Sequence, residues 1–236
     1  MKIQIIKYCL TFILLLGSAG EIFAQDFEET KLQAEQGDAQ AQTDLGIMYW
    51  SGNGVPKNFV EAIKWYRLAA EQESLYAQMR LGEAYLYGWG IPENVAEAAK
   101  WYRLGALQGN LPAQNTLGEI LSKRVNRGSV TENDTEAVYW YRKAALQGYP
   151  QAQGNLGIMY GQGDGVPQND FRAYIWLALA AAKGIENAKG NRDIISRRLT
   201  QDQLTRGQDI AAKAFESYCL PLFMKNKESS VYKDCE

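Results

Sequence analysis

The fold of this chain is decided by residues 41–70, which read AQTDLGIMYWSGNGVPKNFVEAIKWYRLAA. The same pattern returns 36 residues later, where residues 77–106 read AQMRLGEAYLYGWGIPENVAEAAKWYRLGA. A third copy begins at Ala113 and carries three extra residues, and a fourth begins at Ala152. Repetition at a fixed spacing of this size is typical of solenoids, in which one short structural unit is stacked many times. We therefore expect repeats at about 41–76, 77–112, 113–151 and 152–187, after half a unit at 26–40.

Each repeat predicts two helices joined by a tight loop. Leu45 and Tyr49 are four residues apart, so with their neighbours they form one apolar stripe of a first helix. Gly52 accepts the left-handed conformation that ends a helix, and Pro56 prevents the helix from continuing. A second apolar stripe follows at about residues 60–71. The pattern therefore predicts an all-α protein of stacked antiparallel helical hairpins.

Glycine recurs at two positions of the repeat, one inside the first helix and one at the end of the second helix. Gly46 lies inside the first helix, where glycine costs about 1 kcal/mol relative to alanine, so we expect a second helix to approach closely there. The equivalent residues are Gly82, Gly118 and Gly157. The second helix usually ends at a glycine, as at Gly37, Gly109, Gly148 and Gly184. Glu73 takes this place in the first full repeat, so we expect its turn to reverse the chain differently.

Tryptophan and tyrosine recur at one place in the second helix. The pairs are Trp65-Tyr66, Trp101-Tyr102 and Trp140-Tyr141, and the fourth repeat keeps only the tryptophan, as Trp176. These residues share a helical stripe with alanines, which favours packing between hairpins over a stacking platform for sugars or bases.

Three motifs in fixed order resemble the Sel1-like repeat, a relative of the tetratricopeptide repeat. They are Ala-x-x-x-Leu-Gly-x-x-Tyr at 41–49, Gly-x-Gly-Val-Pro at 52–56 and Ala-x-x-Trp-Tyr-x-x-Ala-Ala at 62–70. The resemblance covers about residues 34–190 and implies a right-handed α-solenoid, a TPR-like superhelix.

The segment after the repeats resembles the terminal helix pair of many bacterial Sel1-like proteins. Thr200 and Gln203 have the spacing of a capping box, which predicts the start of the last helix. We therefore expect the repeat array at 25–190, capping helices at 188–218 and a C-terminal tail at 219–236.

The first 24 residues read as a signal peptide. Lys2 and Lys7 precede and flank a short apolar run that ends at Leu16, and small residues lead to a cleavage site before Gln25. The run is shorter than the roughly 20 residues of a membrane helix. We expect an exported protein, periplasmic or secreted, with no stable membrane span after cleavage. An uncleaved N-terminal anchor is the alternative.

Cys219 and Cys235 remain after the leader is removed. In an oxidising compartment they would close a disulfide-bonded loop of 17 residues. Two free thiols, or pairing between chains, are the alternatives.

Composition argues against several functions. The chain has no histidine, which removes the commonest general base and metal ligand. Its net charge of −2 argues against binding to nucleic acid. No nucleophile and base stand at a recognisable spacing. We therefore expect no catalytic residue, no cofactor and no metal site.

The resemblance implies an adaptor that binds a protein or peptide in the concave groove of the solenoid. We expect such an adaptor to be a monomer. The alternative is a cell-wall or β-lactam-active hydrolase of the secreted Sel1-like branch. That branch carries a cysteine pair within its repeats, which this sequence lacks.

Candidate partner-binding residues lie on the face of the first helices opposite the apolar stripe. We expect this face to line the groove, because first helices line the concave side of TPR-like solenoids. The predicted residues are Thr43, Ile47, Trp50, Met79, Glu83, Leu86, Glu119 and Ile158. The alternative is that these side chains pack against the adjacent first helix.

Overall fold

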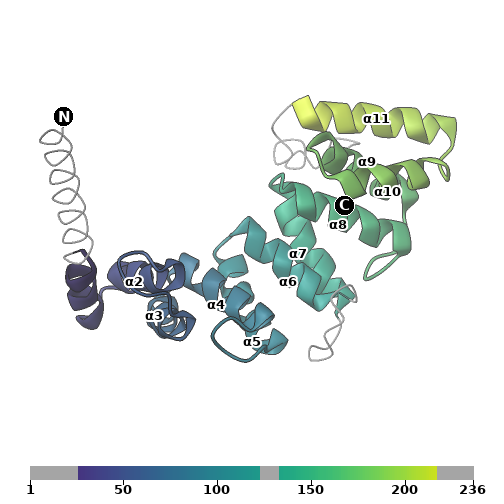
Figure 1. Cartoon of the computed structure of the whole chain (residues 1–236). Coiled ribbons are helices and arrows are strands. Elements are labelled where there is room, and N and C mark those ends of the chain that lie inside the picture. The colour runs from purple at the N-terminus through teal and green to yellow at the C-terminus, as the bar shows by residue number, and fades with distance from the viewer. Residues whose placement is uncertain (1–25, 123–132, 217–236) are drawn as a thin grey trace, which may run out of the picture. The chain divides into compact units, whose positions relative to one another are not determined.

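The computed structural model describes residues 26–122 and 133–216, and every regular element in these ranges is an α-helix (Figure 1). None of the helices in these ranges is long and apolar enough to cross a membrane. The predicted signal peptide and both tail cysteines, Cys219 and Cys235, lie outside the described residues.

The chain divides between Trp101 and Tyr102 into two compact units. The N-terminal unit holds a helix at 26–35, α2 (Ala39–Ser51), α3 (Phe59–Glu71), α4 (Leu75–Tyr87) and the start of α5 (Val95–Leu107). The C-terminal unit holds the rest of α5, α6 (Leu111–Leu121), α7 (Asp134–Leu146), α8 (Pro150–Gln162), α9 (Asp170–Ala182), α10 (Glu186–Ser196) and α11 (Gln201–Glu216). Helices that are consecutive in the sequence pack together as hairpins, among them α2 with α3, α6 with α7, and α8 with α9.

The loop of each hairpin is fixed by backbone hydrogen bonds. After α2, Gly52 has a φ of 79° and its N–H donates to the carbonyl of Met48, which ends the helix. The N–H of Asn58, the residue that caps α3, then donates to the carbonyl of Tyr49 over 2.8 Å. The same bond closes the other loops, from Asn94 to Tyr85, Asn133 to Leu121 and Asn169 to Tyr160. This bond is therefore common to all four hairpins, including the one between α6 and α7, whose sequence lacks the Gly-x-Gly-x-Pro motif.

The glycine inside the first helix faces a large side chain, as the sequence predicted. A Cβ built on Gly46 would meet the ring of Tyr66 at 2.5 Å, and one on Gly118 would meet Tyr141 at 2.7 Å. These tyrosines are fully buried. The glycine thus allows the second helix to lie close enough for its tyrosine to fill the hairpin core.

The tryptophans behave less uniformly than the sequence predicted. Trp140 and Trp176 are buried, which confirms a core role for these two. Trp65 and Trp101 are only half-buried and pack at the edge of hydrophobic clusters. In the N-terminal unit the tyrosine of the pair, Tyr66, is therefore the main core aromatic.

A buried glutamine joins each repeat to the helix before it. The Nε2 atom of Gln114 donates to the carbonyl of Ala106 over 3.1 Å, eight residues earlier. The same bond is made by Gln42 to Ala34, Gln78 to Ala70 and Gln153 to Ala145. The same carbonyl also accepts the N–H of the turn residue three positions later, as Ala106 does from Gly109, so the glutamine adds a second hydrogen bond at the end of the preceding helix. This explains why glutamine follows alanine at the start of every repeat.

The expectation that Glu73 would change its turn was wrong. Glu73 has a φ of 65°, the left-handed conformation that glycine adopts in the other turns. The bonds around it are also the same, because Glu73 N–H donates to Ala70 and Ser74 N–H donates to Ala69. These bonds hold the residue in place although its side chain disfavours that conformation.

The C-terminal end of the array is covered by α11. The predicted capping box is confirmed: Gln203 N–H donates to Thr200 Oγ1 over 3.3 Å, and Thr200 N–H donates to Gln203 Oε1 over 3.0 Å. The helix then packs on α9, where Gly207 lies against the ring of Tyr174. The two last helices therefore close the hydrophobic face of the fourth repeat.

Candidate functional site

In the N-terminal unit, a hollow of about 560 Å³ lies between α2 and the start of α4. Two predicted site residues, Thr43 and Ile47, are among its lining residues. Thr43 is buried, and its Oγ1 donates to the carbonyl of Ala39 and lies 2.9 Å from Ser74 Oγ. Thr43 therefore forms the floor of the hollow and joins successive first helices, while Ile47 is half-buried at its wall.

Trp50 belongs to an aromatic cluster at the end of α2. Its ring centroid lies 4.7 Å from that of Phe59 and 5.4 Å from that of Trp89. Trp50 is half-buried, whereas Trp89 is 39% exposed and Tyr87, stacked beside it, is 51% exposed. The cluster therefore has an inner ring that packs on the core and outer rings that face solvent.

Arg80 lies on α4, the next first helix after α2, and joins the aromatic cluster to that helix. Its guanidinium lies 5.4 Å from the centroid of Trp50 and 5.2 Å from that of Tyr76, and its Nη1 is 2.7 Å from Glu83 Oε2. Burial works against the charge of Arg80, but the hydrogen bonds to Glu83 and Tyr76 outweigh it and raise its pKa. Arg80 is thus a fixed cation between aromatic rings.

The remaining predicted residues of this unit are unequally placed. Met79 and Glu83 are half-buried on α4, but Leu86 is buried, with 6% of its surface exposed. Leu86 therefore contributes to the core rather than to an open surface. Trp89, by contrast, lies in the loop after α4, was not among the predicted site residues, and is an exposed aromatic. The sequence holds one indication of this exposed aromatic: the equivalent loop positions of two other repeats hold the polar residues Asn53 and Asp164 instead of a tryptophan.

The C-terminal unit has a hollow of about 540 Å³, called here the polar hollow. Its lining residues come from α6, α8 and α10. They are Glu119 of α6; Gln151, Gly154, Asn155 and Ile158 of α8; Ile185, which precedes α10; and Glu186, Asn187, Ala188, Gly190, Asn191 and Ile194 of α10. Two predicted site residues, Glu119 and Ile158, are thus brought together, and three successive first helices provide the walls.

Two asparagine side chains donate hydrogen bonds to the carboxylate of Glu119 in this hollow. Glu119 Oε1 accepts a hydrogen bond from Asn115 Nδ2 over 2.8 Å and one from Asn155 Nδ2 over 3.3 Å. Asn155 Nδ2 also donates to Asn115 Oδ1. Burial, together with the charge of Glu119, raises the pKa of nearby Tyr149. The negative charge is therefore held in place by neutral donors.

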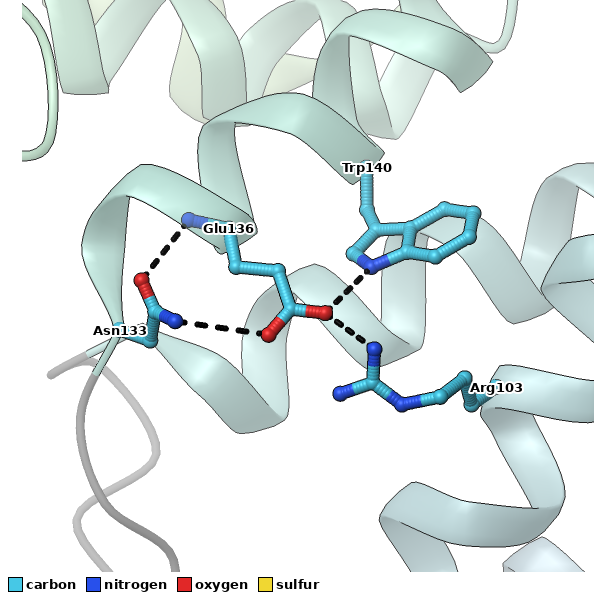
Figure 2. A network of polar contacts seen from close by, with 4 residues as sticks. All are labelled: Arg103, Asn133, Glu136 and Trp140. Atoms are coloured by element: carbon cyan, nitrogen blue, oxygen red, sulfur yellow. Dashed lines mark hydrogen bonds and ion pairs between the residues drawn. The ribbon is translucent and has the colours of Figure 1, made fainter.

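A second carboxylate is fixed between α5 and α7, where Figure 2 shows Glu136 surrounded by donors. Arg103 and the indole nitrogen of Trp140 donate to its Oε1, and Asn133 reaches its Oε2. The hydrogen bond from Arg103 lowers the pKa of Glu136, against the opposing effect of burial. A carboxylate saturated by three donors is suited to joining helices rather than to moving protons.

Repeated hairpins, with successive first helices lining a hollow in each unit, define a helical repeat protein of the solenoid class. A family model described as Sel1 repeat matches residues 39–74, 75–110, 111–149 and 150–185, so the chain belongs to the Sel1 repeat family. Sel1 repeat proteins generally mediate interactions between proteins.

Two solved structures share the fold. A protective antigen of uropathogenic Escherichia coli that displays an SLR fold is 31% identical with a TM-score of 0.69, over 90% of this chain and 47% of that chain. A Sel1 repeat protein from Oxalobacter formigenes is 31% identical with a TM-score of 0.61, over 81% of this chain and 80% of that chain.

One curated relative is similar over a shorter stretch. The secretory immunoglobulin A-binding protein EsiB of Escherichia coli is 36% identical over 67 residues, which are 28% of this chain and 14% of that protein. The chain thus matches only a small part of this relative and less than half of the uropathogenic antigen.

Proposed function

We propose that this chain is a non-catalytic scaffold of the bacterial cell envelope or secreted space, and that it binds a protein or peptide through its first-helix faces. The observation that carries the proposal is the cluster of Trp50, Tyr76, Arg80 and Trp89 beside the hollow of the N-terminal unit. Tryptophan, tyrosine and arginine dominate the binding energy of protein interfaces, because large rigid side chains bury much area at little entropic cost.

The geometry of the cluster supports binding rather than core packing alone. Its inner members are fixed by ring contacts and by the Arg80–Glu83 ion pair, while Tyr76, Tyr87 and Trp89 remain between 39% and 51% exposed. Exposed aromatic side chains gathered at one place are unfavourable in water and typical of an interaction surface. A preorganised anchor loses little conformational entropy when a partner covers it.

The absence of histidine from the sequence and the saturation of Glu136 support a role without catalysis. The leader-like residues 1–24 support export. In an oxidising compartment we further propose that Cys219 and Cys235 form an intramolecular disulfide. Mass spectrometry of the protein from its source cell should find a terminus near Gln25; an intact Met1 would contradict export.

The test of partner binding is a pair of variants in the N-terminal unit. Trp89→Ala removes the exposed ring of the cluster, and Leu68→Ala removes an exposed apolar side chain of the second helix α3 as a matched control. Each protein is used to capture crosslinked partners from the native envelope fraction, and its thermal unfolding is measured in parallel. We expect Trp89→Ala to lose the partner at an unchanged melting temperature while Leu68→Ala retains it. Equal capture by both variants would contradict the proposal.

A further inference from the structure

We propose that the polar hollow of the C-terminal unit binds an extended peptide segment whose lysine or arginine side chain pairs with Glu119. The inference rests on the proposed function and specifies the class of partner for this surface. Three features of the hollow support it: its open floor, its amide and apolar lining, and its uncompensated negative charge.

The open side of the hollow lies at Gly190. A Cβ built on Gly190 would meet nothing within 4 Å, so this helix surface is bare. Gly154, on α8, is buried, and its Cβ would touch Ala180, Ala188 and Ile185 only at ordinary contact distance. Gly154 takes the place held by Thr43 and Asn115 in other repeats, where a side chain rises from the helix. The missing side chain at Gly190 gives a backbone room to approach, whereas the space at Gly154 is occupied by neighbouring side chains.

The residues that line the hollow offer hydrogen-bonding groups and apolar surface to an extended peptide. Within the described residues, the side-chain amides of Gln151, Asn187 and Asn191 make no hydrogen bond. Each amide can both donate and accept, so it can pair with the N–H and C=O groups that a peptide must satisfy when it leaves water. Ile158 and Ile194 add apolar surface, and Ile194 is 53% exposed.

The negative charge of the hollow favours a peptide that carries a basic side chain. The charged residues among those that line it are Glu119 and Glu186, so a cation from a ligand would be complementary. The described partners of Glu119 are neutral amides, which hold its carboxylate toward the hollow without neutralising it. A lysine or arginine would add the attraction between two opposite full charges, which the amide donors cannot supply. The same charge disfavours nucleic acid, and no aromatic ring is among the lining residues to stack on a sugar.

The experiment uses a random dodecapeptide library displayed on phage and selected against the full mature chain. We expect the selected peptides to be enriched in lysine or arginine. A synthetic copy of the tightest peptide should lose on the order of tenfold or more in affinity with Glu119→Gln, as for other hydrogen bonds to charged groups. Replacing its basic residue by norleucine should cause the same loss, and the two changes together should add little.

Three further variants make the result specific. Gly190→Leu fills the hollow from an open helix position, so it should abolish peptide binding without lowering the melting temperature. Glu35→Gln and Glu71→Gln, which change exposed carboxyls of the other unit, should leave peptide affinity unchanged. The inference is overturned if no peptide is selected, if basic residues are not enriched, or if Glu119→Gln and Gly190→Leu bind like the wild type. In each of these cases the Trp89-dependent capture of an envelope partner still decides the proposed function separately.

Discussion

The ring of Tyr66 lies against the helix backbone at Gly46, so close that a methyl group there would come within 2.5 Å of two ring carbons. Tyr66 is fully buried at the centre of the N-terminal hydrophobic cluster. The hairpin of α2 and α3 therefore depends on an absent side chain. Because the relationship recurs between Gly118 and Tyr141, it is a property of the repeat rather than of one hairpin.

Replacing Gly46 by alanine should destabilise the protein. The gain in helix propensity, about 1 kcal/mol, is opposed by an overpacking cost of about 1–3 kcal/mol, since a fully buried ring cannot move away. Gly190→Ala is the matched control, because a methyl group there would meet nothing within 4 Å and only the propensity gain remains. Urea unfolding should therefore shift in opposite directions for the two variants. A stabilised Gly46→Ala protein would show that Tyr66 is not packed as described.

Replacing Glu73 by glycine should stabilise the protein by about 1 kcal/mol, because glycine adopts the left-handed conformation without steric cost. Glu73 has a φ of 65°, the only positive φ among the non-glycine residues that the structure describes. Glu71→Gly, in the last turn of α3, is the control and should destabilise instead. The two midpoints of thermal unfolding measure the difference. Destabilisation by both changes would mean that the Glu73 side chain contributes more than its backbone costs.

Replacing Gln114 by glutamate should produce a protein whose stability falls as the pH rises. The amide is buried and donates to the Ala106 carbonyl, so a glutamate there can keep the bond only when protonated. Its folded pKa should lie above the unfolded value of about 4.3. Stability is then fully present below that unfolded value and is lost as the pH rises through the folded pKa.

At neutral pH we expect Gln114→Glu to lose about 1–3 kcal/mol relative to the wild type, and much less near pH 4. Gln208→Glu, at an exposed position in the middle of α11, is the control and should show no such trend. Urea unfolding at several pH values between 4 and 8 provides the measurement. A constant difference across this range would contradict the burial of the Gln114 amide.

Glu136 should contribute to acid sensitivity with the opposite sign. Its pKa is lowered in the folded protein by the bond from Arg103, so its stabilising effect is present above the unfolded pKa and disappears as the pH falls through the folded pKa. Glu136→Gln should therefore flatten the loss of stability below about pH 4.3. Acid titration of the melting temperature, with Glu35→Gln as the control, measures this. Parallel acid limbs for the wild type and Glu136→Gln would exclude the contribution.

Periodicity predicted the hairpins, the close approach at Gly46 and the cap at Thr200, because each follows from local physics that repeats along the chain. The turn at Glu73 was not predicted correctly, since backbone hydrogen bonds common to all repeats override the preference of one residue. Helical phase placed Glu119 and Ile158 together, but it did not predict the burial of Leu86. Phase is a property of one helix, whereas burial depends on the neighbouring elements as well.

The exposure of Trp89 was not predicted, for a related reason. Its loop matches the repeat pattern, in which the glycines indicate a turn, and that pattern does not predict the environment of the side chain between them. Glutamine recurs at the position of Gln114 in every repeat of the sequence, but the carbonyl to which each one donates is seen only in the structure. Side chains that act on the preceding helix cannot be assigned from the pattern of their own helix.

Position-specific photocrosslinking measures directly whether a protein binds to the first-helix faces. A photoreactive phenylalanine analogue is placed at Met79 or Ile158 on first helices, or at Lys64 or Lys143 on second helices, and each protein is irradiated in its native envelope fraction. We expect a discrete adduct with one protein from the first-helix positions and none from the second-helix positions. Adducts that form only from Lys64 and Lys143, or equally from all four positions, would contradict this expectation.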